Sequence, residues 1–262
     1  MAKPKVTVII PVYNAEEYLE ETLISVFNQS LKGLQIICVN DGSKDNSFEI
    51  LKKYKSKLTI LQTGNKGASV ARNKALEVTK GTYVSFIDAD DTIPENYLEL
   101  LYKNIKESKA DMVVTGFNFI QGGNTIKFMN PLQLGIYTTF TDKIKSLYNG
   151  ALWNKLFRAS LIKKNNLLFE EGMVWEDNLF IIQALYYAKK LSVIYEPCYN
   201  YRVHETSVTN SSNLAEKRTK DAKIIFKETM NFVKSKKLPE GEIQLVETFL
   251  RTKAMPDYIV YD

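Results

Sequence analysis

The stretch Tyr83-Val84-Ser85-Phe86-Ile87-Asp88-Ala89-Asp90-Asp91 is the most informative part of this chain. It begins as a run of strand-forming residues and then places three carboxylates within four positions. A buried strand does not hold that much negative charge, so we expect the acids just past its C-terminal end. In an open α/β sheet, ligands bind at the carboxyl ends of the strands. The stretch therefore predicts an α/β protein with a ligand site at Asp88 and Asp90.

The acid pair itself suggests a metal ion. Alternate side chains of an extended segment point the same way, so Asp88 and Asp90 are expected to face one side together. Two like charges this close need a counter-charge, and a divalent cation that prefers hard oxygen ligands supplies it. The alternative is an Asx-type turn, or a cap for the helix expected over residues 96–108. We assign that cap to Asp91, which leaves the other two acids for a metal.

Composition limits the class of protein. With 262 residues, 45% of them hydrophobic, the chain forms one domain of two lobes or a domain with an appendage. No apolar run approaches the roughly 18 residues of a membrane span, and residues 1–5 lack the apolar region of a signal peptide. Cys38 and Cys198 form no CxxC pattern, which predicts buried free thiols in a reducing cytoplasm.

The net charge of +5 suits an anionic ligand or an anionic membrane surface. No basic stripe is interleaved with aromatic residues, so we expect no nucleic-acid partner.

Strands and helices alternate through about residue 110. Each short apolar, β-branched run is followed by a turn and a helical pattern, which predicts a parallel, doubly wound sheet. The predicted strands cover residues 6–10, 35–39, 58–61 and 83–87. Pro11 is expected to end the first of them, because proline cannot donate within a central strand.

Three strand ends would bring Tyr13, Asp41 and the Asp88/Asp90 pair to one edge of this sheet. Neither GxGxxG after the first strand nor GxxxxGK[ST] occurs, so a dinucleotide fingerprint and a P-loop are absent. A nucleotide would bind by another route. Tyr13 would stack on a base, Asp41 would accept from a base N–H, and a metal would hold a diphosphate.

Four segments in this order resemble the motifs of family 2 glycosyltransferases with the GT-A fold. The segments are Val8-Ile9-Ile10-Pro11-Val12-Tyr13-Asn14, Val39-Asn40-Asp41-Gly42-Ser43, Gly67-Ala68-Ser69-Val70-Ala71-Arg72-Asn73 and Phe86-Ile87-Asp88-Ala89-Asp90-Asp91. The resemblance implies a Rossmann-like, mostly parallel central sheet flanked by helices. It also implies an inverting transferase of the bacterial surface-polysaccharide type that uses a nucleotide-diphospho-sugar.

The resemblance also implies roles for individual residues. Tyr13 would flank the base with Pro11, Asp41 would bind uracil, Arg72 would lie near the nucleotide, Asp88 would meet the ribose, and Asp90 would ligate Mn²⁺ or Mg²⁺. Without the family pattern, Tyr13 and Arg72 would be read as a surface aromatic and a helix-face charge. The predicted nucleotide-sugar site is Pro11, Val12, Tyr13, Asp41, Asn65, Gly67, Arg72, Asp88, Ala89 and Asp90.

Beyond residue 110 the pattern changes. Residues 111–117 are predicted as one strand, and residues 121–124 as the turn of a hairpin with 125–129. The segment 152–158 mixes aromatic and charged residues and has the pattern of a half-buried helix start. It also resembles a family segment that precedes the catalytic acid, which makes Trp153 and Lys155, together with Trp175, candidates for the wall of the sugar and acceptor pocket.

A second acidic site is Val174-Trp175-Glu176-Asp177-Asn178, which opens an apolar helix over 179–188. Either acid would also serve as a helix cap or a first-turn charge. An inverting transfer, however, needs a carboxylate that takes the proton of the acceptor hydroxyl, and a separate metal for the departing diphosphate. The pair resembles the family's E-D motif, in which the Asp is the general base. Asp177 is therefore the predicted base, and Glu176 would orient the acceptor or the surroundings of Asp177.

His204 is the only histidine of the chain. A lone histidine is most often a structural or surface residue. The pattern Y-x-Y-R-x-H-x-x-S over residues 199–207 nevertheless resembles the closing segment of family members in which a late histidine adds a metal ligand. Imidazole with carboxylate favours Mn²⁺ over Mg²⁺. Arg202 is an alternative contact for the diphosphate.

The last part of the chain has no family signature. A helix over 214–237 with an excess of lysine would either pack on the catalytic domain or form a peripheral foot on an anionic leaflet, near a lipid-linked acceptor. The apolar ending at 256–262 predicts a fragment of a longer chain. The predicted domains are a catalytic domain over 1–210, with a nucleotide-sugar half over 1–110 and an acceptor half over 111–210, and a helical extension over 211–262.

Together these features predict a cytoplasmic, metal-dependent glycosyltransferase, with the inner face of the plasma membrane as a second location. It would move a sugar from a UDP-sugar to a hydroxyl of a glycan or lipid-linked saccharide. A sugar-nucleotide pyrophosphorylase is less favoured, because the glycine-rich basic loop after the first strand is missing. A catalytically inactive sugar-nucleotide-binding module is less favoured because it would have no reason to keep both Asp90 and Asp177.

Overall fold

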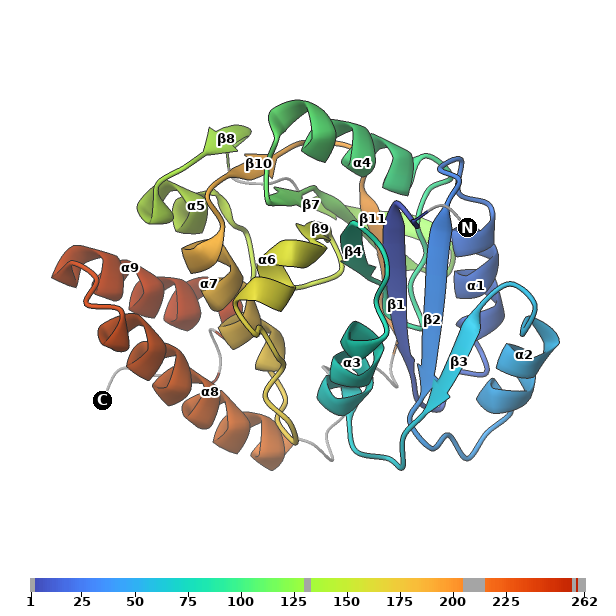
Figure 1. The fold of residues 1–262 in the computed structure, drawn as a ribbon. Helices are drawn as coiled ribbons and strands as arrows, with labels where there is room; N and C mark the ends of the chain where they lie inside the picture. The colour runs from blue at the N-terminus through green and yellow to red at the C-terminus, as the bar shows by residue number, and fades with distance from the viewer. Residues whose placement is uncertain (1–2, 130–132, 205–214, 256–257, 259–262) are drawn as a thin grey trace.

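Eight strands form the central sheet of the protein, in the order β3-β2-β1-β4-β9-β5-β10-β8 (Figure 1). The computed structural model describes residues 3–129, 133–204, 215–255 and 258. The strands β1 to β4 are all parallel, whereas β9 and β8 run antiparallel to their neighbours. The strands are β1 (Val6–Val12), β2 (Leu34–Asn40), β3 (Thr59–Gln62), β4 (Tyr83–Phe86), β5 (Met112–Val114), β8 (Gly135–Tyr137), β9 (Lys155–Arg158) and β10 (Leu191–Val193). The predicted mostly parallel α/β sheet is confirmed.

Helices cover both faces of this sheet. Apolar residues alternate along the strands, so that β1 sends Ile9 into one core and Val8 and Ile10 into the other. The first core lies under α3, α5, α6 and α7, and the second under α1, α2 and α4. The helices are α1 (Leu19–Phe27), α2 (Ser47–Lys53), α3 (Ala68–Glu77), α4 (Tyr97–Ser108), α5 (Phe140–Ser146), α6 (Ala159–Lys164), α7 (Glu176–Tyr187), α8 (Ala215–Ser235) and α9 (Glu240–Phe249).

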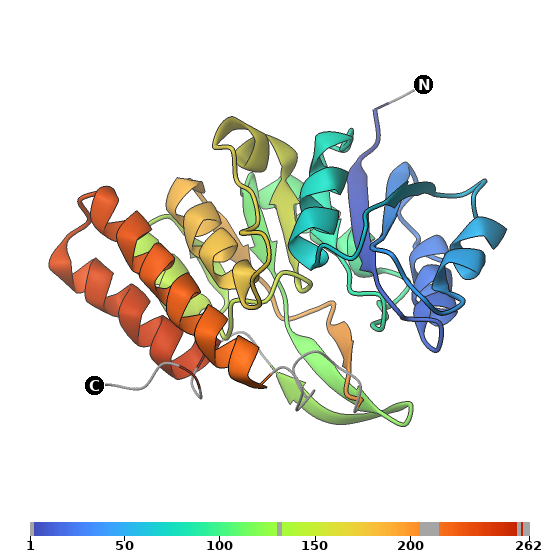
Figure 2. The same ribbon diagram turned by 90° about the horizontal axis from the view of Figure 1, so that it is seen from below.

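A smaller sheet has the strand order β11-β6-β7, with β6 (Phe117–Gln121), β7 (Asn124–Met129) and β11 (Tyr199–Arg202) (Figure 2). The predicted hairpin is confirmed, with Gly122 and Gly123 at positive φ in its turn. The prediction of one strand over 111–117 is wrong, because the chain leaves the large sheet after Val114 and enters the small one at Phe117. Both parts are apolar, so their pattern does not show where one strand ends.

Two further predictions about strands are wrong. β1 continues through Pro11, which pairs with Val39 of β2. Proline is tolerated there because the pairing of β1 with β4 already ends at Ile9 and Phe86, so no ladder partner is lost on that side. Residues 155–158 form strand β9 between β4 and β5 and not the start of a helix. A short apolar run does not distinguish the two structures by its period.

Helix α8 packs on α7, and its face with Ala222, Ile225 and Val233 joins the first core. This agrees with the packed alternative for that helix, while Lys220, Lys223 and Lys227 on its other side are exposed. The chain continues from α9 into a π-helical turn, Leu250–Ala254. The predicted boundary at residue 210 lies outside the described residues, as does most of the ending 256–262. Of the helices described, none is both long and apolar enough to cross a membrane. Cys38 and Cys198 are both buried and free.

Candidate active site

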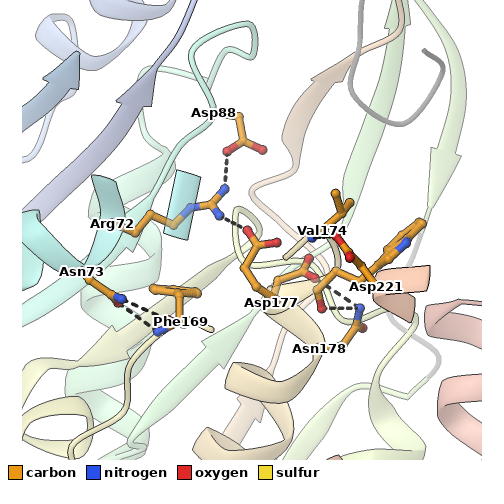
Figure 3. A network of polar contacts seen from close by, with 10 residues as sticks. Arg72, Asn73, Asp88, Phe169, Val174, Asp177, Asn178 and Asp221 are labelled. Carbon is orange, nitrogen blue, oxygen red and sulfur yellow. Dashed lines mark hydrogen bonds and ion pairs between the residues drawn. The ribbon is translucent and has the colours of Figure 1, made fainter. Parts of the chain in front are cut away.

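Arg72 of α3 joins the two acidic segments that the sequence singles out (Figure 3). Its guanidinium lies 3.2 Å from Asp88 Oδ1, just after β4, and 2.5 Å from Glu176 Oε1, at the start of α7. The Arg72 side chain is only 10% exposed, and it packs over the ring of Phe169. Burial raises the pKa of Asp88, and the positive charge of Arg72 opposes this rise.

Asp177, the predicted base, follows Glu176 in the first turn of α7. It is half-buried, and its Oδ1 accepts a hydrogen bond from Asn178 Nδ2 at 3.2 Å. Burial raises the pKa of Asp177 to about 7; the charge of Glu176 adds to this, while Arg72 and Lys155 oppose it. A carboxylate whose pKa lies near neutral pH is suited to general-base catalysis.

The acids after β4 form a turn and not an extended segment, because Asp91 N donates to Asp88 O at 3.2 Å. The prediction that Asp88 and Asp90 face one side as alternate residues of a strand is therefore wrong. Asp88 contacts Arg72, whereas Asp90 Oδ2 lies 2.8 Å from His204 Nε2. Asp91 does not cap α4, whose first turn starts after Asn96. Its carboxylate is buried and accepts from Arg202 N at 2.7 Å.

The two predicted metal ligands, Asp90 and His204, lie in contact with each other, with Asp90 Oδ2 2.8 Å from His204 Nε2. The ring centroids of His204 and Tyr18 lie 4.7 Å apart, and the side chains of Asp90 and His204 are both partly exposed. Within the part of the chain that the structure describes, no cluster of three or more His, Cys, Asp or Glu side chains is arranged for a metal. Two protein donors nevertheless fit a cation that takes its remaining ligands from substrate phosphates and water. Arg202 binds Glu21 at 2.5 Å and the carbonyl of Asp90, so its side chain has partners other than a diphosphate.

The predicted binding site for the uracil ring lies at the carboxyl ends of β1 and β2. Tyr13 is 44% exposed, whereas Val12 beside it is buried. The Asp41 carboxylate organises the following loop, since it accepts from Thr63 Oγ1 at 2.6 Å, from Lys66 N at 2.8 Å and from Gly67 N at 2.6 Å. Its role toward uracil remains a prediction. The remaining residues predicted for this site lie along the same edge: Pro11 in β1, Asn65 and Gly67 in the loop, and Ala89 in the turn after β4.

The three predicted pocket residues lie in different surroundings. Trp153 stacks on both Tyr199 and Tyr201 of β11, with ring centroids 4.7 and 5.4 Å away. Lys155 is fully buried, donates to Asn154 Oδ1 and the carbonyl of Ala151, and its pKa is lowered by burial to about 7. Trp175 precedes α7 and packs on Tyr258. Contact of these three side chains with a sugar or acceptor remains a prediction.

Several polar residues at the site were not predicted. Asn73, next to Arg72, exchanges hydrogen bonds of 2.9 and 3.0 Å with the backbone of Phe169. Asn178 binds Asp177, and Gly150 lies so close that a Cβ there would be 1.9 Å from Asn178 Oδ1. Tyr199 accepts a hydrogen bond from the backbone N–H of Asp88. Asn73 and Tyr199 lie inside segments that resemble the family, but their contacts depend on the folded chain.

A mostly parallel sheet flanked by helices, with acidic turns at its carboxyl edge, agrees with the GT-A fold of glycosyltransferases. The family model described as "Glycosyl transferase family 2" matches residues 7–165, and the chain belongs to that family. The predicted family and fold are confirmed.

The relatives support this class. The chain is 32% identical over 225 residues to EpsH of Bacillus subtilis, a proposed glycosyltransferase, covering 79% of this chain and 63% of EpsH. It is 36% identical over 212 residues to the poly(ribitol-phosphate) beta-glucosyltransferase of Bacillus spizizenii, covering 76% of this chain and 32% of that protein. The chain thus spans less than two thirds of either relative.

The solved structure of S. aureus TarS 1-349 in complex with UDP-GlcNAc has a TM-score of 0.79 and 24% sequence identity to this chain. The match covers 97% of this chain and 74% of that one. At this identity the match supports the fold.

The raised pKa of Asp177 predicts that this residue lowers the stability of the protein at high pH. The folded state holds the Asp177 proton up to about pH 7, whereas the unfolded chain loses it near 3.8. Between these values the unfolded state binds fewer protons, so the free energy of unfolding falls as pH rises. We expect Asp177→Asn to raise the free energy of unfolding by about 1–2 kcal/mol at pH 8 and by almost nothing at pH 4. The value at pH 8 is smaller than the full pKa difference would give, because solvent reaches part of the Asp177 side chain.

Urea denaturation of both proteins at the two pH values measures this effect. A variant equally stable to wild type at pH 8 would show that the Asp177 pKa is not raised.

Proposed function

We propose that the protein is an inverting glycosyltransferase that moves a hexosyl or N-acetylhexosaminyl group from a UDP-sugar to a hydroxyl of a glycan or lipid-linked saccharide. The observation that carries the proposal is the position of Asp177 in the first turn of α7, next to Glu176. Glu176 pairs with Arg72, and Arg72 also pairs with Asp88 at the edge of the sheet assigned to the sugar donor. Asp177 would take the proton of the attacking hydroxyl as that oxygen bonds to the anomeric carbon and the UDP oxygen departs. In-line attack inverts the anomeric centre.

Glu176 is assigned to the surroundings of the base. Its Oε1 binds Arg72 at 2.5 Å and the residue is 9% exposed, which leaves little of it for an acceptor. Its negative charge helps raise the pKa of Asp177, so it supports the basicity of its neighbour. Of the two roles predicted for Glu176, the geometry favours the second.

The donor is assigned by chemistry and by relatives. An exposed aromatic ring at Tyr13 and a carboxylate at Asp41, both at strand ends, suit a uracil base, and TarS binds UDP-GlcNAc. Asp88 would accept from ribose hydroxyls, and its Oδ1 lies 3.2 Å from the Arg72 guanidinium. The acceptor is assigned to surface polysaccharides, because a relative at 36% identity acts on poly(ribitol-phosphate).

A divalent cation fits beside Asp90 and His204. Carboxylate and imidazole together suit Mn²⁺, and such a cation would neutralise the diphosphate as it departs. The residues of this chain would then hold the cation through one oxygen and one nitrogen, with Tyr18 packed on the imidazole.

The proposed place of action is the cytoplasm, where UDP-sugars are made. A lipid-linked acceptor would bring the enzyme to the inner face of the membrane, and the exposed lysines of α8 are compatible with that surface.

The base assignment predicts a specific kinetic change. Asp177→Asn should bind UDP as wild type does but lose turnover of its UDP-sugar by at least about 100-fold. The wild-type kcat/KM should rise with pH through a midpoint of about 7, because the base works in its ionised form. UDP release from a panel of UDP-sugars, beginning with UDP-GlcNAc, measures both. Wild-type turnover by the Asn variant would remove Asp177 as the base.

The metal assignment predicts that Mn²⁺ raises UDP affinity in wild type and that a chelator reverses the gain. Asp90→Ala and His204→Ala should each reduce this gain by about tenfold, since each removes one ligand. Asp142→Ala serves as a control, because this exposed carboxylate accepts a hydrogen bond from Thr139 Oγ1, the N-cap residue of α5. Calorimetric titration of UDP with and without Mn²⁺ provides the values. The same metal dependence in Asp90→Ala as in wild type would contradict the assignment.

A further inference from the structure

We infer that Asp221 of α8 is a positioning residue for the catalytic carboxylates, because it holds the backbone immediately before Glu176 and Asp177. The inference rests on the proposed function, in which Asp177 is the base. Asp221 lies outside the segment that the family model matches, residues 7–165. Its side chain is 5% exposed, which is unusual for a carboxylate without a structural or functional role.

The contacts of Asp221 converge on the segment before α7. Its Oδ2 accepts from Val174 N at 2.9 Å and from Lys217 Nζ at 2.5 Å. Lys217 Nζ also donates to Gly172 O at 2.7 Å. Figure 3 shows Asp221 beside Val174 at the start of α7. One helix of the C-terminal part thus binds two backbone groups of residues 172–174.

Trp175, which lies between Val174 and the acids Glu176 and Asp177, has a strained backbone. Trp175 has φ 71° and ψ 14°, the left-handed region that bulky side chains rarely adopt. Such a conformation persists only when its surroundings determine it. On its C-terminal side, Trp175 O accepts from Asn178 N at 3.1 Å and from Asn178 Nδ2 at 3.2 Å. On its N-terminal side the fixed group is Val174 N, held by Asp221.

The segment has a second anchor at its other end. Asn73 binds both backbone groups of Phe169, and Asn73 is the neighbour of Arg72 on α3. The chain that leads to Glu176 and Asp177 is therefore fixed to α3 at Phe169 and to α8 at Val174. Removal of the Asp221 acceptor would leave a part-buried N–H unpaired and release the second anchor. Glu176 and Asp177 would then lose their fixed direction toward Arg72 and the donor.

Three variants test this role. Asp221→Ala removes the acceptor, whereas Asp221→Asn keeps an oxygen that can accept from both Val174 and Lys217. Glu247→Ala is the control, because Glu247 of α9 makes a comparable i,i+4 ion pair, with Arg251 of the following π-helical turn, at 3.0 Å. Each protein is measured for amide hydrogen exchange of residues 172–178, for kcat with UDP-GlcNAc, and for the affinity of UDP in Mn²⁺.

In Asp221→Ala we expect amide hydrogen exchange at residues 172–178 to be about tenfold faster than in wild type and kcat to be about tenfold lower. The affinity for UDP should stay within about twofold of wild type. Asp221→Asn and Glu247→Ala should stay within about threefold of wild type in all three measurements. Unchanged exchange in Asp221→Ala, an equal loss in Asp221→Asn, or a parallel loss of UDP affinity would each overturn the inference.

If Asp221→Ala does not fold, Lys217→Met decides, since its 45% exposed side chain supplies the contact to Gly172. Faster exchange at 172–178 supports the inference, and unchanged exchange overturns it. Asp177→Asn, measured beside these variants, separates the two claims. Wild-type turnover by Asp177→Asn contradicts the base but leaves the exchange result for Asp221 intact.

Discussion

The site depends on one buried cation, the Arg72 guanidinium between Asp88 and Glu176. A charge without a partner in the interior is costly, and breaking such a pair typically costs about 3–5 kcal/mol because the other charge is left behind. Here one arginine connects the turn after β4, helix α3 and the first turn of α7. The edge assigned to the donor and the helix that carries the proposed base are thereby fixed in one geometry. The packing of Phe169 on Arg72 and the bonds from Asn73 to Phe169 support the same arrangement.

The same arrangement explains how an aspartate can act near neutral pH. Burial and the charge of Glu176 raise the pKa of Asp177, while Arg72 and Lys155 limit the rise, so the value stays near 7 and not far above it. Lys155 is itself buried and donates to Asn154 Oδ1 and to the carbonyl of Ala151, and burial lowers its pKa. Buried ionisable side chains with shifted pKa values reduce the stability of the folded protein, and they are common at functional sites.

The sequence allowed prediction of the parallel half of the fold and of the acidic turns. Each of β1 to β4 is a short apolar run followed by a helical period, and that local pattern survives in the structure. The antiparallel insertion of β9 between β4 and β5 was not predictable, because pairing between distant strands leaves no periodic signal. Asn73 and Asp221 were missed for a related reason. Each binds a backbone group far along the chain, and no spacing within the sequence indicates such contacts.

The most direct test of the account is the ionisation of Asp177 itself, followed by ¹³C NMR of the aspartate carboxyl groups in wild type and in Arg72→Met. The Asp177 signal is assigned by its absence from Asp177→Asn. The account predicts a titration midpoint of about 7 in wild type and a rise of about one unit or more without the arginine, because a neighbouring positive charge is removed. A midpoint near the ordinary aspartate value of about 4 in both proteins would contradict it.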